Sequence, residues 1–207
     1  MNFSKDKYGF WRQDSPEPFE YDENYKAIQK TTDAMAWLRL GFLFSVISPG
    51  ECRGFLACDV GSGNGCFAKA VRGCFSSISE YDLSGDSITR DELEHTDWDI
   101  VFLTDVLEHF GQIDDLFGLH FRYVFLSFPE TPSVDDWREL SEWRHFRPNE
   151  HIWCLNEDGV VRWLDDHGYE TVARGNPEDA IRRPQPGLKR NISTVIARKK
   201  QATPSQN

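Results

Sequence analysis

A glycine-rich run follows a short apolar segment and could hold a small ligand. It reads Asp59-Val60-Gly61-Ser62-Gly63-Asn64-Gly65. Glycines let a backbone turn tightly and approach a ligand, and the N-terminus of a following helix offers unpaired N–H groups to a carboxylate or phosphate. Cys66 stands where the dinucleotide fingerprint GxGxxG requires glycine, and the lysine of a P-loop is absent. Asp59 would repel a pyrophosphate but suits an ammonium group, so the run favours an amino-acid-bearing nucleoside.

A second acid, Asp82, stands 21 residues after Gly61, at the end of the next apolar segment. Where a glycine loop follows the first strand of a sheet, an acid at the end of the second strand commonly binds the hydroxyls of a ribose. Asp82 therefore supports a nucleoside ligand. The alternative interpretation is a turn residue that opens Asp82-Leu83-Ser84-Gly85.

Aromatic, cationic and imidazole side chains gather between Pro129 and Trp153 and could contact a second substrate. They are Trp137, Arg138, Trp143, Arg144, His145, Phe146, Arg147, His151 and Trp153. Such a rim suits a planar or anionic acceptor, although the tryptophans could instead be packing anchors and the arginines could pair with neighbouring glutamates. His145 and His151 are six residues apart with no third ligand at a suitable spacing, so no metal site is expected.

The N-terminal segment is also rich in aromatic residues. Residues 8–12 and 18–25, which include Tyr21, precede the first expected core strand. They could form a cap that excludes water and orders the acceptor, with Tyr21 as a substrate contact. Alternatively, these aromatic side chains pack on the flank of the sheet.

Strands and helices are expected to alternate along the chain and to position these groups. The expected strands are residues 55–60, 77–83, 99–103, 123–128, 169–172 and 193–197, and the expected helices are residues 24–46, 66–73, 106–119, 133–143 and 156–168. A box of Ser133 and Asp136 would open the fourth helix, and Asn156 would cap the fifth. This alternation predicts an α/β fold, a doubly wound and mostly parallel sheet covered on both faces, with ligands at the carboxyl ends of its strands.

Length and composition indicate one folded domain. The 207 residues are 39% hydrophobic and 14% aromatic, which is enough for a sizeable core, and no apolar run approaches the roughly 20 residues that span a bilayer. Five cysteines without a CxxC pair, and the lack of a secretory signal, predict a cytoplasmic location. We expect an N-terminal cap segment over residues 1–50, the core over 51–200 and a flexible tail over 201–207.

The net charge of −11 is unevenly distributed. Residues 181–207 hold seven lysines or arginines and no carboxylate, so residues 1–180 carry 16 basic and 34 acidic side chains, a net charge of −18. An acidic body repels phosphate backbones, so duplex nucleic acid is disfavoured as a partner. A small anionic acceptor or a single nucleotide is not excluded, and the sequence does not indicate the oligomeric state.

Several of these motifs resemble class I S-adenosylmethionine-dependent methyltransferases. The similarity is carried by Phe55 to Gly65, by Tyr81-Asp82, by the run from Trp98 to His109 that ends in DVLEH, and by Glu150 to Trp153 leading into residues 160–169. It is closest to the small-molecule branch that includes ubiquinone-type O-methyltransferases. The resemblance implies S-adenosylmethionine as the cofactor and a seven-stranded Rossmann-like sheet whose last strand, near residues 193–197, is antiparallel.

The resemblance also implies roles for individual residues. Asp59, Gly61 and Gly63 would line the methionine part of the cofactor, Asp82 would bind its ribose, and Thr104 and Asp105 would lie beside the sulfonium. Ser62 and Leu83 are further expected cofactor contacts. His109 matches the histidine that ends the DVLEH motif, and it could be a base or could orient the loop. His145 of the aromatic rim is the other candidate base, while Glu108 and Asp105 are alternatives. The expected substrate contacts are Tyr21, Trp137, Arg144 and His151.

One departure from the family pattern concerns the third strand. Only 16 residues separate Asp82 from Asp99, which is too few for the usual helix, third strand and acidic adenine loop. The third-strand region is therefore expected to be shortened or missing, and adenine contacts are not assigned.

The sequence as a whole favours a methyltransferase that acts on a hydroxyl or nitrogen of a small acceptor. A second hypothesis is modification of a nucleic acid or a nucleotide precursor, because the rim of arginines and aromatic residues could hold a flipped base. A third is a protein with the methyltransferase fold that binds a cofactor or partner without catalysis.

Overall fold

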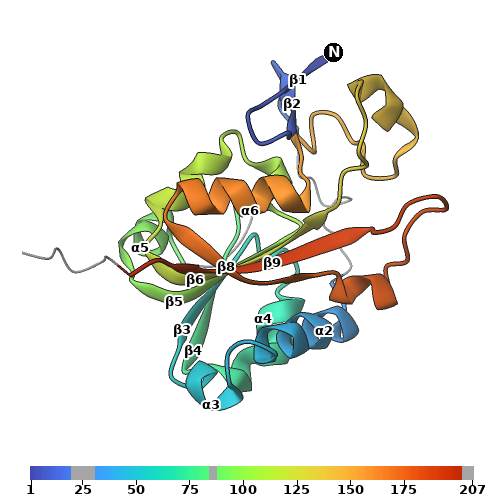
Figure 1. Cartoon of the computed structure of the whole chain (residues 1–207). Helices are drawn as coiled ribbons and strands as arrows, with labels where there is room; N and C mark the ends of the chain where they lie inside the picture. The colour runs from blue at the N-terminus through green and yellow to red at the C-terminus, as the bar shows by residue number, and fades with distance from the viewer. Residues whose placement is uncertain (20–30, 84–87, 202–207) are drawn as a thin grey trace, which may run out of the picture.

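The fold is built on one central sheet (Figure 1). The computed structural model describes residues 1–19, 31–83 and 88–201. Within them the sheet has six strands in the order β4, β3, β5, β6, β9, β8. Their bounds are Leu56–Val60 (β3), Ser77–Tyr81 (β4), Trp98–Thr104 (β5), Phe121–Pro129 (β6), Tyr169–Gly175 (β8) and Ile192–Lys199 (β9). β9 is antiparallel to both neighbours and β4, β3, β5 and β6 are parallel, which confirms the predicted Rossmann-like sheet with an antiparallel last strand.

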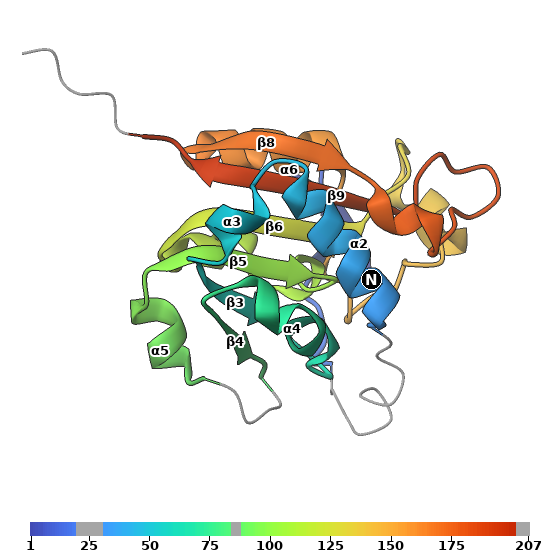
Figure 2. The same cartoon turned by 90° about the horizontal axis from the view of Figure 1, so that it is seen from below.

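Helices cover both faces of this sheet (Figures 1 and 2). α2 (Asp33–Phe44), α3 (Pro49–Cys52) and α4 (Cys66–Val71) lie on one face, and α5 (Arg90–His95) and α6 (Glu157–Asp166) lie on the other. An apolar core lies on each face of the sheet, and β5 contributes side chains to both. Ile100 and Phe102 pack toward α2 and α4, while Val101 and Leu103 pack toward α6. Burial of both faces explains why this strand is an uninterrupted apolar run.

The helix boundaries agree in part with the expected ones. α6 begins after Asn156, whose side chain accepts a hydrogen bond from the Gly159 N–H as an N-cap. The long helix expected over residues 24–46 is α2, which starts after the N-cap Thr32 and ends at Phe44; residues 24–30 lie outside the described part of the chain. Among the described residues, no helix is long and apolar enough to cross a membrane.

Two expected helices are short 3₁₀ turns instead. The segment 106–119 forms η2 (Leu107–His109) and η3 (Ile113–Gly118), separated at Gly111. The segment 133–143 forms only η4 (Trp137–Glu142), and its capping box consists of Asp136 and Glu139 rather than Ser133 and Asp136. The Glu139 side chain reaches back to the Asp136 N–H, and the Asp136 side chain accepts from the Arg138 N–H. The pair therefore satisfies two N–H donors at the start of η4.

The sheet ends at β4, as the short spacing between Asp82 and Asp99 predicts. Across residues 1–19, 31–83 and 88–201, no strand pairs with the outer edge of β4, and α5 leads directly into β5. Thr89 and Glu92 form a capping box that starts α5 immediately after the short connection. The usual third strand is therefore missing from the described sheet.

A second, smaller sheet was not predicted. It joins β1 (Asn2–Lys5), β2 (Trp11–Asp14) and β7 (Trp153–Cys154) in antiparallel order. Its inner side packs on η4 through a third apolar core, formed by Phe3, Trp11, Leu140, Trp143 and Cys154. The N-terminal hairpin and the aromatic segment around η4 thus form one unit beside the end of α6 (Figure 1).

Candidate active site

The glycine-rich loop joins β3 to α4 at the carboxyl end of the sheet. The N–H groups of Gly61 and Ser62 donate to the Tyr81 carbonyl at 2.7 and 3.1 Å, so the loop is tied to the end of β4. Gly61 has a φ of +72°, and a Cβ atom there would overlap the side chain of Val106. Both the backbone angle and the lack of space require glycine at this position.

Asp59 places a buried carboxylate beneath this loop. Its side chain is only 1% exposed, and neither carboxylate oxygen has a hydrogen-bond partner among the described residues. Burial raises the pKa of Asp59 to about 7, against the opposing charge of Arg39, and the nearby Glu80 and Asp82 raise it further. A buried carboxylate without a partner is costly unless a ligand supplies a proton donor, so Asp59 is poised to receive a cationic group.

A cavity of about 310 Å³ opens in front of Asp59. It is lined by Thr31, Met35, Asp59, Gly61, Ser62, Gly63, Asn64, Phe67, Thr104, Asp105 and Arg182. Six of the eight expected cofactor contacts are therefore brought together in one place. They lie at the carboxyl ends of the neighbouring strands β3 and β5. The chain continues from β3 to β4 on one side and then returns to β5 on the other, and ligands of such sheets usually bind at this switch point.

The two other expected cofactor contacts, Asp82 and Leu83, follow the end of β4. Asp82 Oδ2 accepts a hydrogen bond from the Gly63 N–H at 2.9 Å, which couples the acid to the loop. Leu83 is 86% exposed, and neither residue belongs to the cavity lining.

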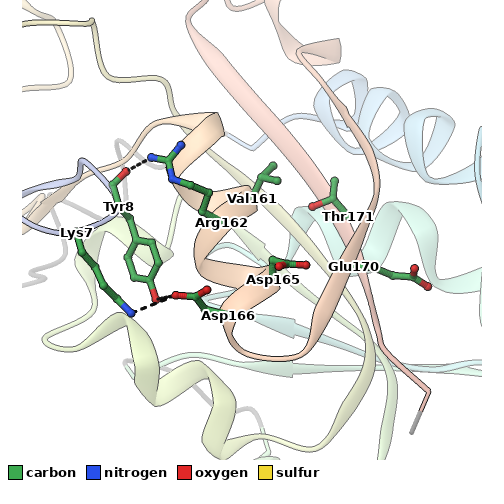
Figure 3. A pocket seen from close by; sticks show the side chains of 8 residues that line it. All are labelled: Lys7, Tyr8, Val161, Arg162, Asp165, Asp166, Glu170 and Thr171. Carbon is green, nitrogen blue, oxygen red and sulfur yellow. Dashed lines mark hydrogen bonds and ion pairs between the residues drawn. The ribbon is translucent and has the colours of Figure 1, made fainter. Parts of the chain in front are cut away.

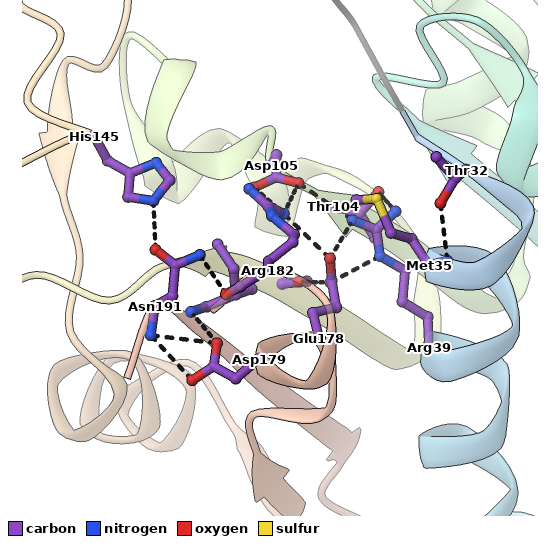
Figure 4. A network of polar contacts seen from close by, with 12 residues as sticks. Thr32, Met35, Arg39, Thr104, Asp105, His145, Glu178, Asp179, Arg182 and Asn191 are labelled. Atoms are coloured by element: carbon purple, nitrogen blue, oxygen red, sulfur yellow. Dashed lines mark hydrogen bonds and ion pairs between the residues drawn. The ribbon is translucent and has the colours of Figure 1, made fainter. Parts of the chain in front are cut away.

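A network of ion pairs closes the other side of the cavity (Figure 4). Arg39 of α2 is fully buried and forms two hydrogen bonds with Glu178, at 2.9 and 3.0 Å. Its Nη1 donates to Thr104 Oγ1, and its Nη2, one of the two nitrogens bonded to Glu178, also donates to Asp105 Oδ2, each at 3.2 Å. Arg182 donates to both oxygens of Asp105, at 3.0 and 2.7 Å, and to Glu178 at 3.1 Å. The network ties α2 and the segment around Arg182 to the end of β5.

Asp105 is held as an anion within this network. Burial disfavours its charge, but Arg182 and Arg39 outweigh that effect and lower the pKa of Asp105 to about 2. Its φ of +58° is unusual for a residue other than glycine, and the strand end and the two arginines hold it there. Asp105 is therefore a structural anion beside the cavity and a weak base.

His145 is buried and connects to the same network through an amide. Its Nε2 atom lies 2.8 Å from Asn191 Oδ1, and Asn191 Nδ2 donates to the Arg182 carbonyl at 2.9 Å. Because the amide nitrogen already donates elsewhere, Asn191 Oδ1 accepts, and Nε2 of His145 carries the proton. Burial lowers the pKa of His145, so the ring is neutral near pH 7 and its Nδ1 can accept a proton.

His109 and His151 meet although 42 positions separate them along the chain. Their ring centroids are 4.8 Å apart with the planes nearly perpendicular. Burial lowers the pKa of each histidine to about 4, and burial raises the pKa of the neighbouring Glu108 well above its usual range. The structure thus places a mostly uncharged group of ionisable side chains immediately after β5.

The remaining expected substrate contacts lie in different surroundings. Trp137 packs on Phe3 and Phe146, with ring centroids 5.4 and 6.3 Å away. Arg144 is exposed, and its backbone N–H donates to Gln185 Oε1 at 3.1 Å. Tyr21 lies outside the described residues.

The buried pair of Arg39 and Glu178 was missed by sequence reasoning. Arg39 follows Met35 by four positions and shares its buried helix face. A lone arginine on an apolar helix face was the available signal, since such a residue is buried only with a partner. Its partner lies 139 residues away, and no local pattern points to it.

A larger cavity, of about 470 Å³, lies elsewhere, between the N-terminal turn and α6 (Figure 3). Tyr8 Oη and Lys7 Nζ both donate to Asp166 Oδ2, at 2.9 and 3.1 Å, and Arg162 donates to the Tyr8 carbonyl. Because the glycine loop and six of the eight expected cofactor contacts line the smaller cavity, that cavity is the candidate active site.

Together, the sheet order, the glycine loop and the buried acid define a Rossmann-like protein with a cavity at the carboxyl ends of β3 and β5. The sequence profile described as a methyltransferase domain matches residues 56–174, which is more than half of the chain. The chain therefore belongs to the methyltransferase-domain family. Membership of the class I S-adenosylmethionine-dependent methyltransferases is confirmed, whereas nothing singles out the ubiquinone-type branch.

Solved structures of methyltransferases share the fold. Magnesium protoporphyrin IX methyltransferase of Synechocystis, with S-adenosylhomocysteine bound, is 16% identical with a TM-score of 0.55, covering 86% of this chain and 92% of its own. An S-adenosylmethionine-dependent methyltransferase of Clostridium acetobutylicum is 9% identical with a TM-score of 0.55, covering 87% and 96%. The 1,6-didemethyltoxoflavin-N1-methyltransferase of Burkholderia thailandensis is 13% identical with a TM-score of 0.50, covering 93% and 95%. Among curated proteins, none matches the chain.

Proposed function

We propose that this chain transfers the methyl group of S-adenosylmethionine to a hydroxyl or nitrogen of a small, planar or anionic acceptor. The observation that carries the proposal is the unpartnered carboxylate of Asp59 in the cavity of the glycine loop. S-adenosylmethionine has an ammonium group that this carboxylate would bind. Family membership and the cofactor-bound solved structures that share the fold support the same ligand.

The residues of the cavity fit the cofactor. Asp59 would bind the ammonium group, the backbone of Gly61 to Gly63 would follow the methionine part, and Asp82 would bind the ribose. Thr104 and Asp105 would lie beside the sulfonium. When bound, the cofactor supplies a methyl group that is activated for in-line displacement.

The chain's own contribution is positioning and proton removal. The ion pairs of Arg39, Asp105 and Arg182 hold the end of β5 in one geometry, and positioning supplies much of the rate of such a displacement. A neutral imidazole beside the acceptor would take the proton that a hydroxyl loses. His145 and His109 both have lowered pKa values and are the candidate bases.

Two observations support a small acceptor. Two of the similar solved structures are methyltransferases named for small, ring-containing acceptors, magnesium protoporphyrin IX and didemethyltoxoflavin. In addition, the charge of −18 over residues 1–180 opposes binding of polymeric nucleic acid. The exposed Arg144 would attract an anionic acceptor toward the rim.

One observation favours a second candidate, a cofactor- or partner-binding protein without catalysis. The described sheet stops at β4, where related folds place the strand and loop that hold adenine. A cofactor bound with fewer adenine contacts would bind weakly, and the fold would then serve binding alone.

Methyl transfer from labelled cofactor distinguishes these functions. The purified full chain is incubated with a nucleic-acid-depleted, low-molecular-weight cell extract, and separately with RNA and DNA. Label in a small molecule supports the proposal. Label in nucleic acid alone supports the nucleotide hypothesis, and cofactor binding without any transfer supports the non-catalytic one.

A further inference from the structure

Three ionisable side chains converge immediately after β5, outside the cofactor cavity. Glu108, His109 and His151 each bring one potential ligand atom, and these atoms all lie within 4.8 Å of one another. Glu108 and His109 come from η2, whereas His151 precedes β7. The Trp153 Nε1–H donates to the Phe110 carbonyl at 2.8 Å, so the two segments are joined beside the cluster.

Glu108 is the member whose environment is unexplained. Its side chain is 2% exposed, and neither carboxylate oxygen has a hydrogen-bond partner within the described residues. A buried carboxyl group without a hydrogen-bond partner is costly, and coordination of a metal ion is one way in which proteins satisfy such a group. No lysine or arginine contacts it within the described part of the chain, while two imidazoles lie beside it.

His151 is oriented as a metal-binding histidine would be. Its Nδ1 lies 2.8 Å from the His145 carbonyl oxygen, which can only accept, so Nδ1 carries the proton and Nε2 presents a lone pair. A second hydrogen bond of this kind fixes the tautomer of metal-bound histidines. Nε2 also lies 3.7 Å from Glu150 Oε1, but that carboxylate is paired with Arg147 at 3.1 Å.

We propose that Glu108, His109 and His151 bind one divalent transition-metal ion. Two imidazole nitrogens and one carboxylate suit Zn²⁺, Fe²⁺, Co²⁺ or Mn²⁺ better than Ca²⁺ or Mg²⁺, which prefer oxygen ligands. Ligand atoms bound at about 2.1 Å in tetrahedral geometry lie about 3.4 Å apart, so atoms that now lie within 4.8 Å of one another would close by up to about 1.4 Å on binding.

The site lies next to the candidate active site. Glu108 follows Asp105 by three residues, and Asp105 lines the cofactor cavity. Three protein ligands leave at least one coordination position open.

The expectation of no metal site considered only His145 and His151, which are six residues apart. In the structure His145 instead contacts Asn191, and the fold supplies Glu108 and His109 from a distant segment.

Metal binding is tested on the untagged full chain with Co²⁺ as the probe, by its visible absorption and by calorimetry. The wild-type chain should bind about one ion, and Glu108→Gln and His151→Ala should each weaken binding by at least about 100-fold, since loss of an outer contact alone costs about 10- to 100-fold. His120→Ala is the matched control. His120 is exposed and directly precedes β6, at the N-terminal ends of β5 and β6 and away from the cluster, so this variant should bind Co²⁺ like the wild type.

A second measurement covers variants that fail to fold. In the wild-type chain, Co²⁺ should broaden the NMR signals of the His109 and His151 rings before those of the exposed His95 and His120. Absence of Co²⁺ binding by the folded wild type, equal binding by Glu108→Gln, or first broadening at the exposed histidines would overturn the proposal. Because no cofactor is present, these outcomes are independent of methyl transfer.

Discussion

Arg39 of α2 and Glu178 form a fully buried ion pair with two hydrogen bonds, at 2.9 and 3.0 Å, across 139 residues of sequence. Glu178 also accepts from Ser127 Oγ at 2.5 Å and from Arg182 at 3.1 Å. The pair therefore joins α2, the C-terminal part of β6 and the segment before β9. Through Thr104 and Asp105 it sets the wall of the cofactor cavity.

Removal of one partner should be costly. Arg39→Met leaves Glu178 buried beside a single remaining arginine, and breaking a buried pair in this way costs about 3–5 kcal/mol. We expect a loss of that size in the free energy of unfolding, measured by urea denaturation.

The control for this variant is Arg122→Met. Arg122 pairs with Glu51 at 3.4 Å on the surface, with both side chains well exposed, and such pairs contribute about 0–1 kcal/mol. Equal effects of the two variants would contradict the role assigned to the buried pair.

Gly61→Val should abolish cofactor binding without unfolding the core. The added side chain would meet Val106 and would oppose a φ of +72°, so the loop must move away from the cavity. Calorimetry with S-adenosylhomocysteine measures the loss. Gly73→Ala is the matched control, since a Cβ atom there meets no atom within 4 Å, and a Gly61 variant that binds normally would refute the assigned loop role.

Cofactor affinity should depend on pH through Asp59. Because the pKa of Asp59 is about 7 without ligand, the group must lose a proton before it binds an ammonium group. Affinity should therefore rise from pH 6 to pH 8, by up to about tenfold per unit below the pKa. Titrations across this range test it, and Asp59→Asn should remove the dependence and weaken binding by about tenfold to a hundredfold.

The raised pKa of Asp59 also predicts how the free energy of unfolding of the ligand-free chain depends on pH. The unfolded carboxyl ionises near pH 4 and the folded one near pH 7, so the unfolded state binds fewer protons between these values. The contribution of Asp59 to stability should be lost as the pH rises from about 4 to 7. In urea titrations, Asp59→Asn should flatten this slope; an unchanged slope would show that Asp59 ionises alike in both states.

His145→Gln tests the candidate base. If the ring takes the acceptor's proton, the rate of label transfer in cell extract should fall by about 10²- to 10⁴-fold while cofactor affinity stays unchanged. His167→Gln is the control, because His167 stacks on Phe117 near α6, away from the cavity. Equal rates for both variants would show that His145 is not the base.

The sheet and the cofactor loop were predictable because their signals are local. β5 is an unbroken apolar run, and the spacing from Asp59 to Gly65 fixes the loop within seven residues. The absence of the usual third strand from the described sheet was predicted from the short spacing between Asp82 and Asp99. β1 and β2 were missed because each has only four residues and gains its stability from η4, whose sequence lies far along the chain.

The side chains around the site could not be assembled from the sequence. His109 and His151 meet because η2, which follows β5, lies against the segment that leads into β7. Arg39 meets Glu178 only after α2 packs on the sheet. Such contacts depend on the tertiary fold. Residue type alone suggested Trp137 as a substrate contact but did not show that its ring packs on Phe3 and Phe146.

Calorimetric titration of S-adenosylmethionine into the 207-residue chain tests directly whether the cavity at Asp59 and the glycine loop holds this cofactor. We expect saturable binding of one molecule per chain, sharply reduced in Asp82→Ala and in Asp59→Asn. A folded wild-type chain that binds neither S-adenosylmethionine nor its demethylated product would contradict it.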